Sequence, residues 1–344
     1  MAKLTAQWRK IGEAQSLQRS SQVVAIAEGQ AYVFGGELEP RKPRDNDIHV
    51  FGVHERGGPS SFHVSTSPSK HSAPSPRVGS AATTINGKIY IFSGRGGIAM
   101  APIDESGGVW EYTTSTLEWT LLSPSNSSAE AMPEARSFHC LASNGHDTLY
   151  LHAGCPEKGR LSDLWAFQIS EKTWTKLRPA PEPGRGGTSI AFAGMLLFRM
   201  NGYDGKNELG GALDIYDPAE DSWTSHTWAA DGQSGPGPRS VATLLPLQIG
   251  GKDFLLTMFG ERDPSALGHE GAGKMLDDVW AFDLAGKQWH MVEGRGDEGL
   301  SREEDRPVAR GWFAADSLGT SALVQGGVGE TNTRLGDAWL LVLD

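Results

Sequence analysis

One short stretch of the chain gathers side chains that could hold a metal ion. The segment from Gly260 to Gly271 reads GERDPSALGHEG, and it places two carboxylates, Glu261 and Asp263, and one imidazole, His269, within nine residues. A mixed set of oxygen and nitrogen ligands suits ferrous iron or a similar divalent ion and leaves coordination positions open for a substrate. A solvated polar loop can have the same composition. Whether the segment binds a metal therefore depends on how the rest of the fold positions these side chains.

Arginine is the second residue type that could do chemistry, because it recurs at intervals. Each copy is followed by small residues and an apolar strand, and successive copies lie 49 to 71 residues apart. The six positions are Arg19, Arg77, Arg136, Arg185, Arg239 and Arg310. A guanidinium group suits a sulfate or a carboxylate. Each arginine could therefore hold an anionic substrate, or it could pair with a neighbouring carboxylate of the fold.

The elements that must position these residues form a repeat. An apolar strand that ends in glycine recurs, as in Tyr32-Val33-Phe34-Gly35, and an alternating aromatic strand then leads to a tryptophan such as Trp174. A period near 50 residues with these features is typical of kelch repeats, which build the blades of a β-propeller. The chain is therefore expected to be all-β and to form a six-bladed kelch β-propeller.

The repeat also predicts the organisation of the chain. We expect one domain over residues 1–344, with blades at about 19–66, 77–122, 136–177, 185–228, 239–292 and 310–344. The last blade lacks its tryptophan strand, and residues 6–11 can supply it, so that the N-terminal strand closes the ring. Long insertions at 37–47, 95–108 and 261–278 are expected to carry the function.

Composition excludes several classes of protein. The formal net charge of −11 argues against a general binder of nucleic acid or of anionic membranes, because both need a basic face. No apolar run is long enough to span a bilayer, and the first eight residues do not resemble a signal peptide. The two cysteines, Cys140 and Cys155, give no disulfide framework. We therefore expect a cytoplasmic protein with reduced thiols.

The chain resembles one group of kelch proteins, the plant nitrile-specifier, epithiospecifier and thiocyanate-forming proteins. The stretches GGEL (35–38), ARSFH (135–139) and RGW (310–312) are similar to GGEL, ARTFHS and RGW in that group. The resemblance covers essentially the whole chain. It implies an iron-dependent, lyase-type activity on a small anionic sulfur-containing substrate, which in that group is a glucosinolate aglucone, with nitrile-type products.

The resemblance also implies a cofactor, Fe²⁺. The group carries an E-x-x-x-D-x-x-x-[HC] iron motif in the loop considered above, and Glu261 and His269 fall on its first and last positions. Ser265 stands at the middle position, and Asp263 lies two residues earlier. Either Asp263 takes the place of the missing ligand, or the metal site is weakened or absent.

The substrate pocket follows from the same resemblance. Arg77 and Arg136 would bind the sulfate of the substrate and act as the catalytic pair, while Glu37, Phe138 and Trp312 would line the pocket. The fold alone does not determine this function, because kelch propellers serve several. A non-catalytic module that binds a protein partner through its loop-rich face remains the alternative.

Overall fold

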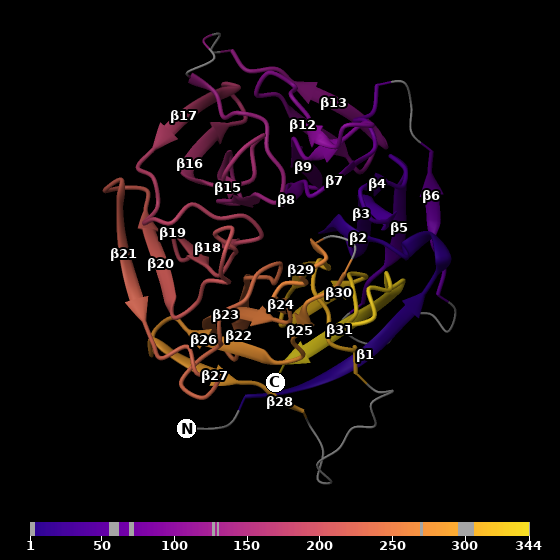
Figure 1. Ribbon diagram of the computed structural model, residues 1–344. Coiled ribbons are helices and arrows are strands. Elements are labelled where there is room, and N and C mark those ends of the chain that lie inside the picture. The colour runs from indigo at the N-terminus through magenta and orange to yellow at the C-terminus, as the bar shows by residue number, and fades with distance from the viewer. Residues whose placement is uncertain are drawn as a thin grey trace.

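The computed structural model describes residues 4–54, 62–68, 72–125, 128, 131–268, 271–294 and 306–343. Within these residues the chain is built mainly from short β-strands, and the 3₁₀ turn η1 (Gln15–Leu17) follows the first of them. Figure 1 shows six antiparallel sheets that stand as blades around a central axis. No helix in the described part of the chain is long and apolar enough to cross a membrane.

Each blade contains four main strands that pair with their neighbours in order from the axis outward. Blade 1 consists of β2 (Ser20–Ala27), β3 (Gln30–Glu39), β5 (Ile48–Gly52) and β6 (Ser65–Ser67). Blade 2 consists of β8 (Ala81–Ile85), β9 (Lys88–Phe92), β12 (Val109–Thr113) and β13 (Glu118–Leu122). Blade 3 consists of β14 (Cys140–Ser143), β15 (Thr148–Gly154), β16 (Leu161–Gln168) and β17 (Thr173–Leu177). Blades 4 and 5 consist of β18 (Ser189–Ala193), β19 (Leu196–Met200), β20 (Ala212–Asp217) and β21 (Ser222–Thr227); and β22 (Leu245–Ile249), β23 (Lys252–Met258), β26 (Val279–Asp283) and β27 (Gln288–Met291).

Blade 6 joins the two ends of the chain. It consists of β29 (Ala314–Leu318), β30 (Ser321–Gln325), β31 (Asp337–Leu343) and the N-terminal strand β1 (Thr5–Glu13), with the short β28 (Glu293–Gly294) at its edge. Strand β1 runs antiparallel to β31, and Trp8 lies opposite Leu341. The prediction of a six-bladed propeller whose last blade is completed by the N-terminal strand is confirmed.

Local sequence explains the blades. Asn86 and Gly87 connect β8 to β9 with φ of 50° and 74°, the left-handed pair that a two-residue hairpin turn requires. In the outer half of blade 3, Phe167 lies opposite Trp174 and their ring centroids are 4.9 Å apart. Such aromatic cross-strand pairs recur in blades 2, 4 and 5 and pack between neighbouring blades.

A ring of backbone hydrogen bonds surrounds the axis. The residue two places after each recurrent arginine donates its N–H to the carbonyl of its counterpart in the preceding blade. The bonds run from Ser21 to Trp312 (2.8 Å), Gly79 to Ser21 (2.9 Å), Phe138 to Gly79 (2.7 Å), Gly187 to Phe138 (2.8 Å), Val241 to Gly187 (2.8 Å) and Trp312 to Val241 (3.2 Å). All six residues have φ between 46° and 63°. We call them the floor ring.

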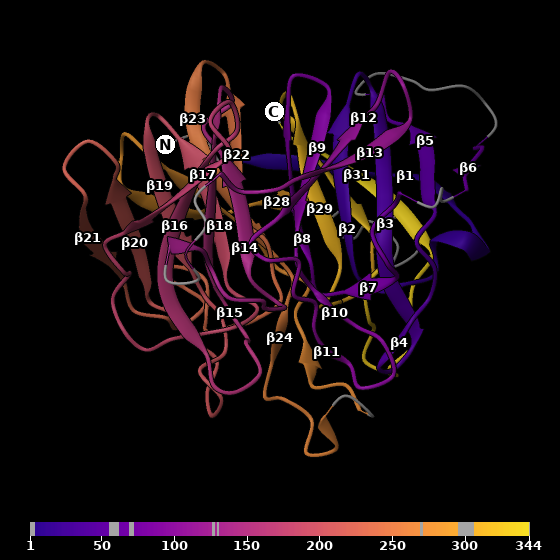
Figure 2. The same ribbon diagram turned by 90° about the horizontal axis from the view of Figure 1, so that it is seen from above.

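The floor ring lies between a channel and a set of loops. The channel, of about 430 Å³, is lined by the innermost strand of every blade. The loops carry short extra strands: β4 (Lys42–Pro43), β7 (Arg77–Val78), β10 (Arg95–Gly96), β11 (Ala101–Pro102), β24 (Glu261–Arg262) and β25 (Lys274–Met275). Figure 2 shows β4, β11 and β24 on the same side of the propeller. We call this side the loop face.

Candidate functional site: a cavity on the loop face

Five of the six recurrent arginines form buried ion pairs. Arg136 donates to both carboxylate oxygens of Asp163, at 2.6 and 2.9 Å, and Arg77 donates to both oxygens of Glu105, at 3.0 and 2.8 Å. The other three pairs are Arg19 with Asp45, Arg239 with Asp278 and Arg310 with Asp337. All five arginine side chains are at most 1 % exposed. A bidentate pair of this kind is among the strongest polar contacts in proteins.

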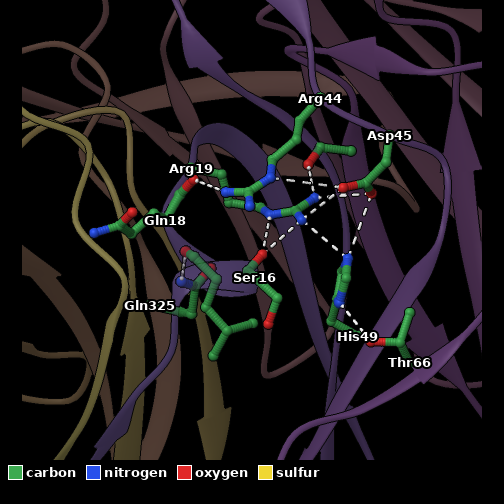
Figure 3. Close-up of polar contacts among 10 residues, drawn as sticks. Ser16, Gln18, Arg19, Arg44, Asp45, His49, Thr66 and Gln325 are labelled. Carbon is green, nitrogen blue, oxygen red and sulfur yellow. Dashed lines mark hydrogen bonds and ion pairs between the residues drawn. The ribbon is translucent and has the colours of Figure 1, made fainter.

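Figure 3 shows the pair of blade 1. The guanidinium of Arg19 lies between the carboxylate of Asp45 and the backbone carbonyl of Ser16, and the ring of His49 contacts both members of the pair. Thr66 in turn contacts the second ring nitrogen of His49. The network lies at the start of the blade and links its first strand to its third.

A cavity of about 500 Å³ opens on the loop face, above the floor ring. Loops from all six blades surround it, so its walls differ in character around the axis. Neither Arg77 nor Arg136 is among its lining residues, whereas Glu37, Phe138, Trp312 and Glu261 are. The anion-binding role predicted for Arg77 and Arg136 would therefore require their guanidinium groups to leave carboxylates inside the fold.

The wall contributed by blades 2 and 3 carries two arginines and one glutamate, Glu157, and we call it the cationic wall. Arg95 follows the glycine that ends the second strand of blade 2, and Arg160 lies just before β16; both line the cavity. Arg95 donates to the carbonyl of Pro156 at 3.3 Å, and its Nε is buried without a partner. Arg160 donates to the carbonyl of Gly159 and lies 5.8 Å from the ring centroid of Tyr203. Within the described residues, neither arginine forms an ion pair with a carboxylate.

Electrostatics agree with this arrangement. Burial lowers the pKa of Arg95, and the nearby charges of Arg41 and Arg160 lower it further. Two guanidinium groups that share one wall repel each other, and an anion bound between them would relieve the repulsion. This wall is the part of the cavity best suited to a sulfate or carboxylate group.

The bottom of the cavity is aromatic. The rings of Phe138 and Trp312 meet edge to face with centroids 5.3 Å apart. Both residues belong to the floor ring and have left-handed φ values of 53° and 59°, a conformation that bulky residues rarely adopt. The equivalent positions in two other blades are glycines, Gly79 and Gly187. The backbone ring imposes the conformation, and the two aromatic side chains add an apolar surface to it.

Blades 4 and 5 contribute an acidic wall. Glu261 is buried, accepts the backbone N–H of Gly273 at 2.7 Å and hydrogen-bonds the side chain of Trp312. Burial raises the pKa of Glu261. Glu208 lines the same wall, and burial followed by the charges of Glu261 and Asp263 raises its pKa as well. Neither carboxyl group forms an ion pair within the described residues, and two adjacent carboxyl groups favour a cation or a shared proton.

The predicted metal ligands are only partly brought together. Glu261 and Ser265 line the cavity, but the side chain of Asp263 is 78 % exposed and lies 3.6 Å from Arg262. His269 lies outside the described residues. The described parts of the chain contain no group of three His, Cys, Asp or Glu residues that could hold a metal ion. Glu261 is thus the one predicted ligand that the structure places at the cavity, and the described residues alone do not form an iron site.

Opposite these walls, blades 1 and 6 are joined by an ion pair. Glu37 binds Arg334 at 3.0 Å and accepts the backbone N–H of Arg41 at 2.7 Å. Both Glu37 and Arg334 line the cavity. The charge of Glu37 is therefore balanced by Arg334, which the sequence pattern does not mark, and the role of Glu37 in binding a substrate remains a prediction.

Sequence reasoning also missed Arg95 and Arg160. Both lie outside the recurrent arginine position, in loops that differ in length and composition from blade to blade. A signal was present for Arg95, because it opens the insertion 95–108 that was expected to carry function. No comparable signal marked Arg160.

Comparison with known proteins supports the class of protein that this fold defines. Residues 21–260 match the family model described as the KLHDC2/KLHL20/DRC7 Kelch-repeats domain. The chain therefore belongs to the kelch-repeat family.

Individual relatives show which kelch proteins this chain is similar to. It is 28 % identical to the N-(sulfonatooxy)prop-2-enimidothioate sulfolyase of Thlaspi arvense, over 99 % of this chain and 98 % of the relative. The resemblance to plant specifier proteins is thereby confirmed. Two other relatives share only a region: the dynein alpha chain of the flagellar outer arm of Chlamydomonas reinhardtii (29 % identical, 63 % of this chain, 5 % of the relative) and the mouse multiple epidermal growth factor-like domains protein 8 (27 %, 70 % and 8 %).

Proposed function

We propose that this kelch protein binds a small anionic sulfur-containing compound in the loop-face cavity and promotes its breakdown in the manner of a specifier protein. The observation that carries the proposal is the cationic wall, where Arg95 and Arg160 have no carboxylate partner within the described residues. In the same molecule five other arginines are fully paired.

The name of the full-length relative supports the substrate class. It describes a compound with a sulfonatooxy group, a thioimidate sulfur and a two-carbon vinyl group. Two of these parts have counterparts in the cavity: the sulfate could be held by Arg95 and Arg160, and the vinyl group by the rings of Phe138 and Trp312. Guanidinium groups bind such oxyanions through two parallel hydrogen bonds. We therefore assign the anion-binding role to Arg95 and Arg160 rather than to Arg77 and Arg136.

Iron remains part of the proposal as its cofactor, and a nitrile-type product as its outcome. Glu261 is the ligand candidate at the cavity, and His269 is the second candidate from the sequence. Ferrous iron would supply an electron-rich metal with affinity for sulfur. The residues of the chain would orient the substrate, with the sulfate at one wall and the vinyl group on the aromatic surface. The cytoplasmic location expected from the sequence likewise stays a prediction.

The proposal is tested by turnover. The compound named for the relative is generated in the presence of the protein and Fe²⁺ under anaerobic conditions, and the products are separated by gas chromatography. We expect a nitrile or related product, and Arg95→Ala and Arg160→Ala should each lower kcat/KM about 10- to 100-fold, since a hydrogen bond to a charged group contributes about 1.5–3 kcal/mol. Arg262→Ala is the control, because Arg262 is exposed on the same loop face and does not line the cavity.

Metal binding is measured separately by anaerobic calorimetry with Fe²⁺ on the native chain, Glu261→Ala and His269→Ala. Stoichiometric binding that both substitutions abolish would establish the metal site. If the native chain neither binds iron nor changes the products, the lyase function is wrong, and a non-catalytic module that binds a partner on the loop face becomes the better description.

A further inference from the structure

Blade 4 departs from the arginine–carboxylate pattern of the other five blades. Its recurrent arginine, Arg185, donates from Nε to the carbonyl of Pro183 at 3.2 Å and from Nη1 to the carbonyl of Asn201 at 3.0 Å. In blade 3, Arg136 makes the equivalent contacts with Glu134 at 2.9 Å and Ala153 at 3.1 Å. Two backbone carbonyls therefore hold the guanidinium of Arg185 in the same orientation as its counterparts.

Blade 4 has no carboxylate at the position that faces the recurrent arginine in blades 3, 5 and 6. In blade 3, Asp163 directly precedes Leu164, which lies opposite His152 in the sheet. The same register in blade 4 places Leu213 opposite Met200, so the residue at the aspartate position is Ala212. Blades 5 and 6 have Asp278 and Asp337 at this position, and each binds its arginine through both oxygens.

Nearby carboxylates do not replace the missing one. Asp214 binds Arg199 through one oxygen, at 2.5 and 3.0 Å, and accepts from Ser225 through the other at 2.6 Å. Asp204 accepts the backbone N–H groups of Lys206 and Asn207 within its own turn. Within the described residues Arg185 forms no ion pair, and its Nη2 makes none of the hydrogen bonds that the other arginines make to carboxylates.

The surroundings are those of an incomplete anion site. Arg185 is only 7 % exposed, and burial, followed by the charge of Arg199, lowers its pKa to about 10. The side-chain amide of Asn201 is 1 % exposed and has no hydrogen-bond partner for its oxygen or its nitrogen. In the five complete blades the carboxylate side chain is 13 to 26 % exposed, so this side of the guanidinium group is open to solvent there.

We infer that the position facing Arg185, where Ala212 replaces the aspartate of blades 3, 5 and 6, is a binding site for a carboxylate or a similar small oxyanion supplied from outside the chain. The five complete blades show what fits: a carboxylate that accepts two hydrogen bonds, at 2.6 to 3.2 Å, from the outer edge of the guanidinium. A bound carboxylate would restore in blade 4 the charge balance of its neighbours. The site is separate from the cationic wall, because Arg185 does not line the loop-face cavity.

The substitution Ala212→Asp tests the inference by supplying the missing carboxylate. Melting temperature is measured in acetate and in sulfate against chloride at constant ionic strength. A ligand that binds only the folded state raises the melting temperature in a saturable manner. We expect such a rise in the native chain and in the control Ala212→Asn, and its loss, with at least tenfold weaker acetate binding, in Ala212→Asp. In chloride alone, Ala212→Asp should melt at a higher temperature than Ala212→Asn.

Three outcomes would overturn the inference. The native chain could show no saturable response to either anion, or Ala212→Asp could respond as strongly as the native chain, which would place the anion elsewhere, such as at Arg95 and Arg160. Ala212→Asp could also melt below Ala212→Asn, which would show that Arg185 does not accept a carboxylate. As a second variant, Arg185→Gln should lose the response even if Ala212→Asp folds poorly. A response to sulfate but not to acetate would exclude carboxylates and assign the site to tetrahedral oxyanions.

Discussion

The arginines at the blade starts and the arginines of the cavity wall have opposite surroundings. Arg136 is fully buried and binds Asp163 at 2.6 Å, and four further blades repeat this arrangement. Arg95 and Arg160 lie in loops, line a cavity of about 500 Å³ and lack a carboxylate partner within the described residues. The charge of the first kind is neutralised by the fold, and the charge of the second kind is available to a ligand.

The difference shows how to identify a functional arginine in a repeat protein. Recurrence at the same position in every blade indicates a contact that each blade needs, here a link between its first and third strands. An arginine that departs from the recurrence, or a recurrent one whose partner is missing, is the better candidate for binding. Arg95 and Arg160 lie outside the recurrent position, and Arg185 is a recurrent arginine whose carboxylate partner is missing.

The largest effect is expected when a paired arginine is removed. Arg136→Ala leaves Asp163 without its guanidinium partner inside the fold, and losing one member of a buried ion pair costs about 3–5 kcal/mol. The free energy of unfolding is measured by urea denaturation. Arg160→Ala, which removes an arginine of the cavity wall, should change it by less than about 0.5 kcal/mol. Equal losses in the two variants would erase the distinction between the two kinds of arginine.

An intermediate effect is expected at a carboxylate that lacks an arginine. Asp316 lies in the channel on the other side of the floor ring and accepts the backbone N–H of Ile26 at 2.7 Å. Burial raises its pKa to about 6 from the ordinary 3.8. The folded state then binds the proton more tightly than the unfolded state, so protonation of Asp316 stabilises the fold. This contribution to the free energy of unfolding is fully present below about pH 4 and is lost as the pH rises to about 6.

The substitution Asp316→Asn should remove this dependence while its oxygen still accepts the bond from Ile26. We expect the variant to be more stable than the native chain at pH 7 by about 3 kcal/mol and to approach it near pH 4. Urea denaturation at a series of pH values gives the difference. A difference that stays constant between pH 4 and pH 7 would show that Asp316 titrates normally.

The smallest effect is expected at the floor of the cavity. Trp312 has a φ of 59°, and Gly79 and Gly187 occupy the same position in other blades. Trp312→Gly should therefore keep the fold and be more stable than Trp312→Ala by about 1 kcal/mol, because alanine meets strain at a left-handed φ that glycine does not. Thermal or urea denaturation compares the two variants. If the alanine variant is the more stable, the floor ring does not impose this conformation.

Much of the architecture could be read from the sequence. The spacing of the arginines, glycine-ended strands and tryptophans predicts six blades, and the incomplete last repeat predicts that the N-terminal strand closes the ring. Strand pairing follows such patterns because alternating side chains and turn residues act locally, over a few neighbours. Glu37, Phe138 and Trp312, which the resemblance placed in a substrate pocket, line the cavity, and their role there remains a prediction.

The partners of the charged side chains were decided only by the tertiary structure. Arg136 and Asp163 are far apart in the sequence, and only the fold of blade 3 brings them together, as only the loops of several blades bring Arg95, Arg160 and Glu261 around one cavity. A repeat determines the position of an arginine in its blade, but the residues that its guanidinium group can contact depend on neighbouring strands and on loops that do not repeat. The sequence alone therefore determined the propeller, while the pairing of charges, which separates structural arginines from binding ones, required the structure.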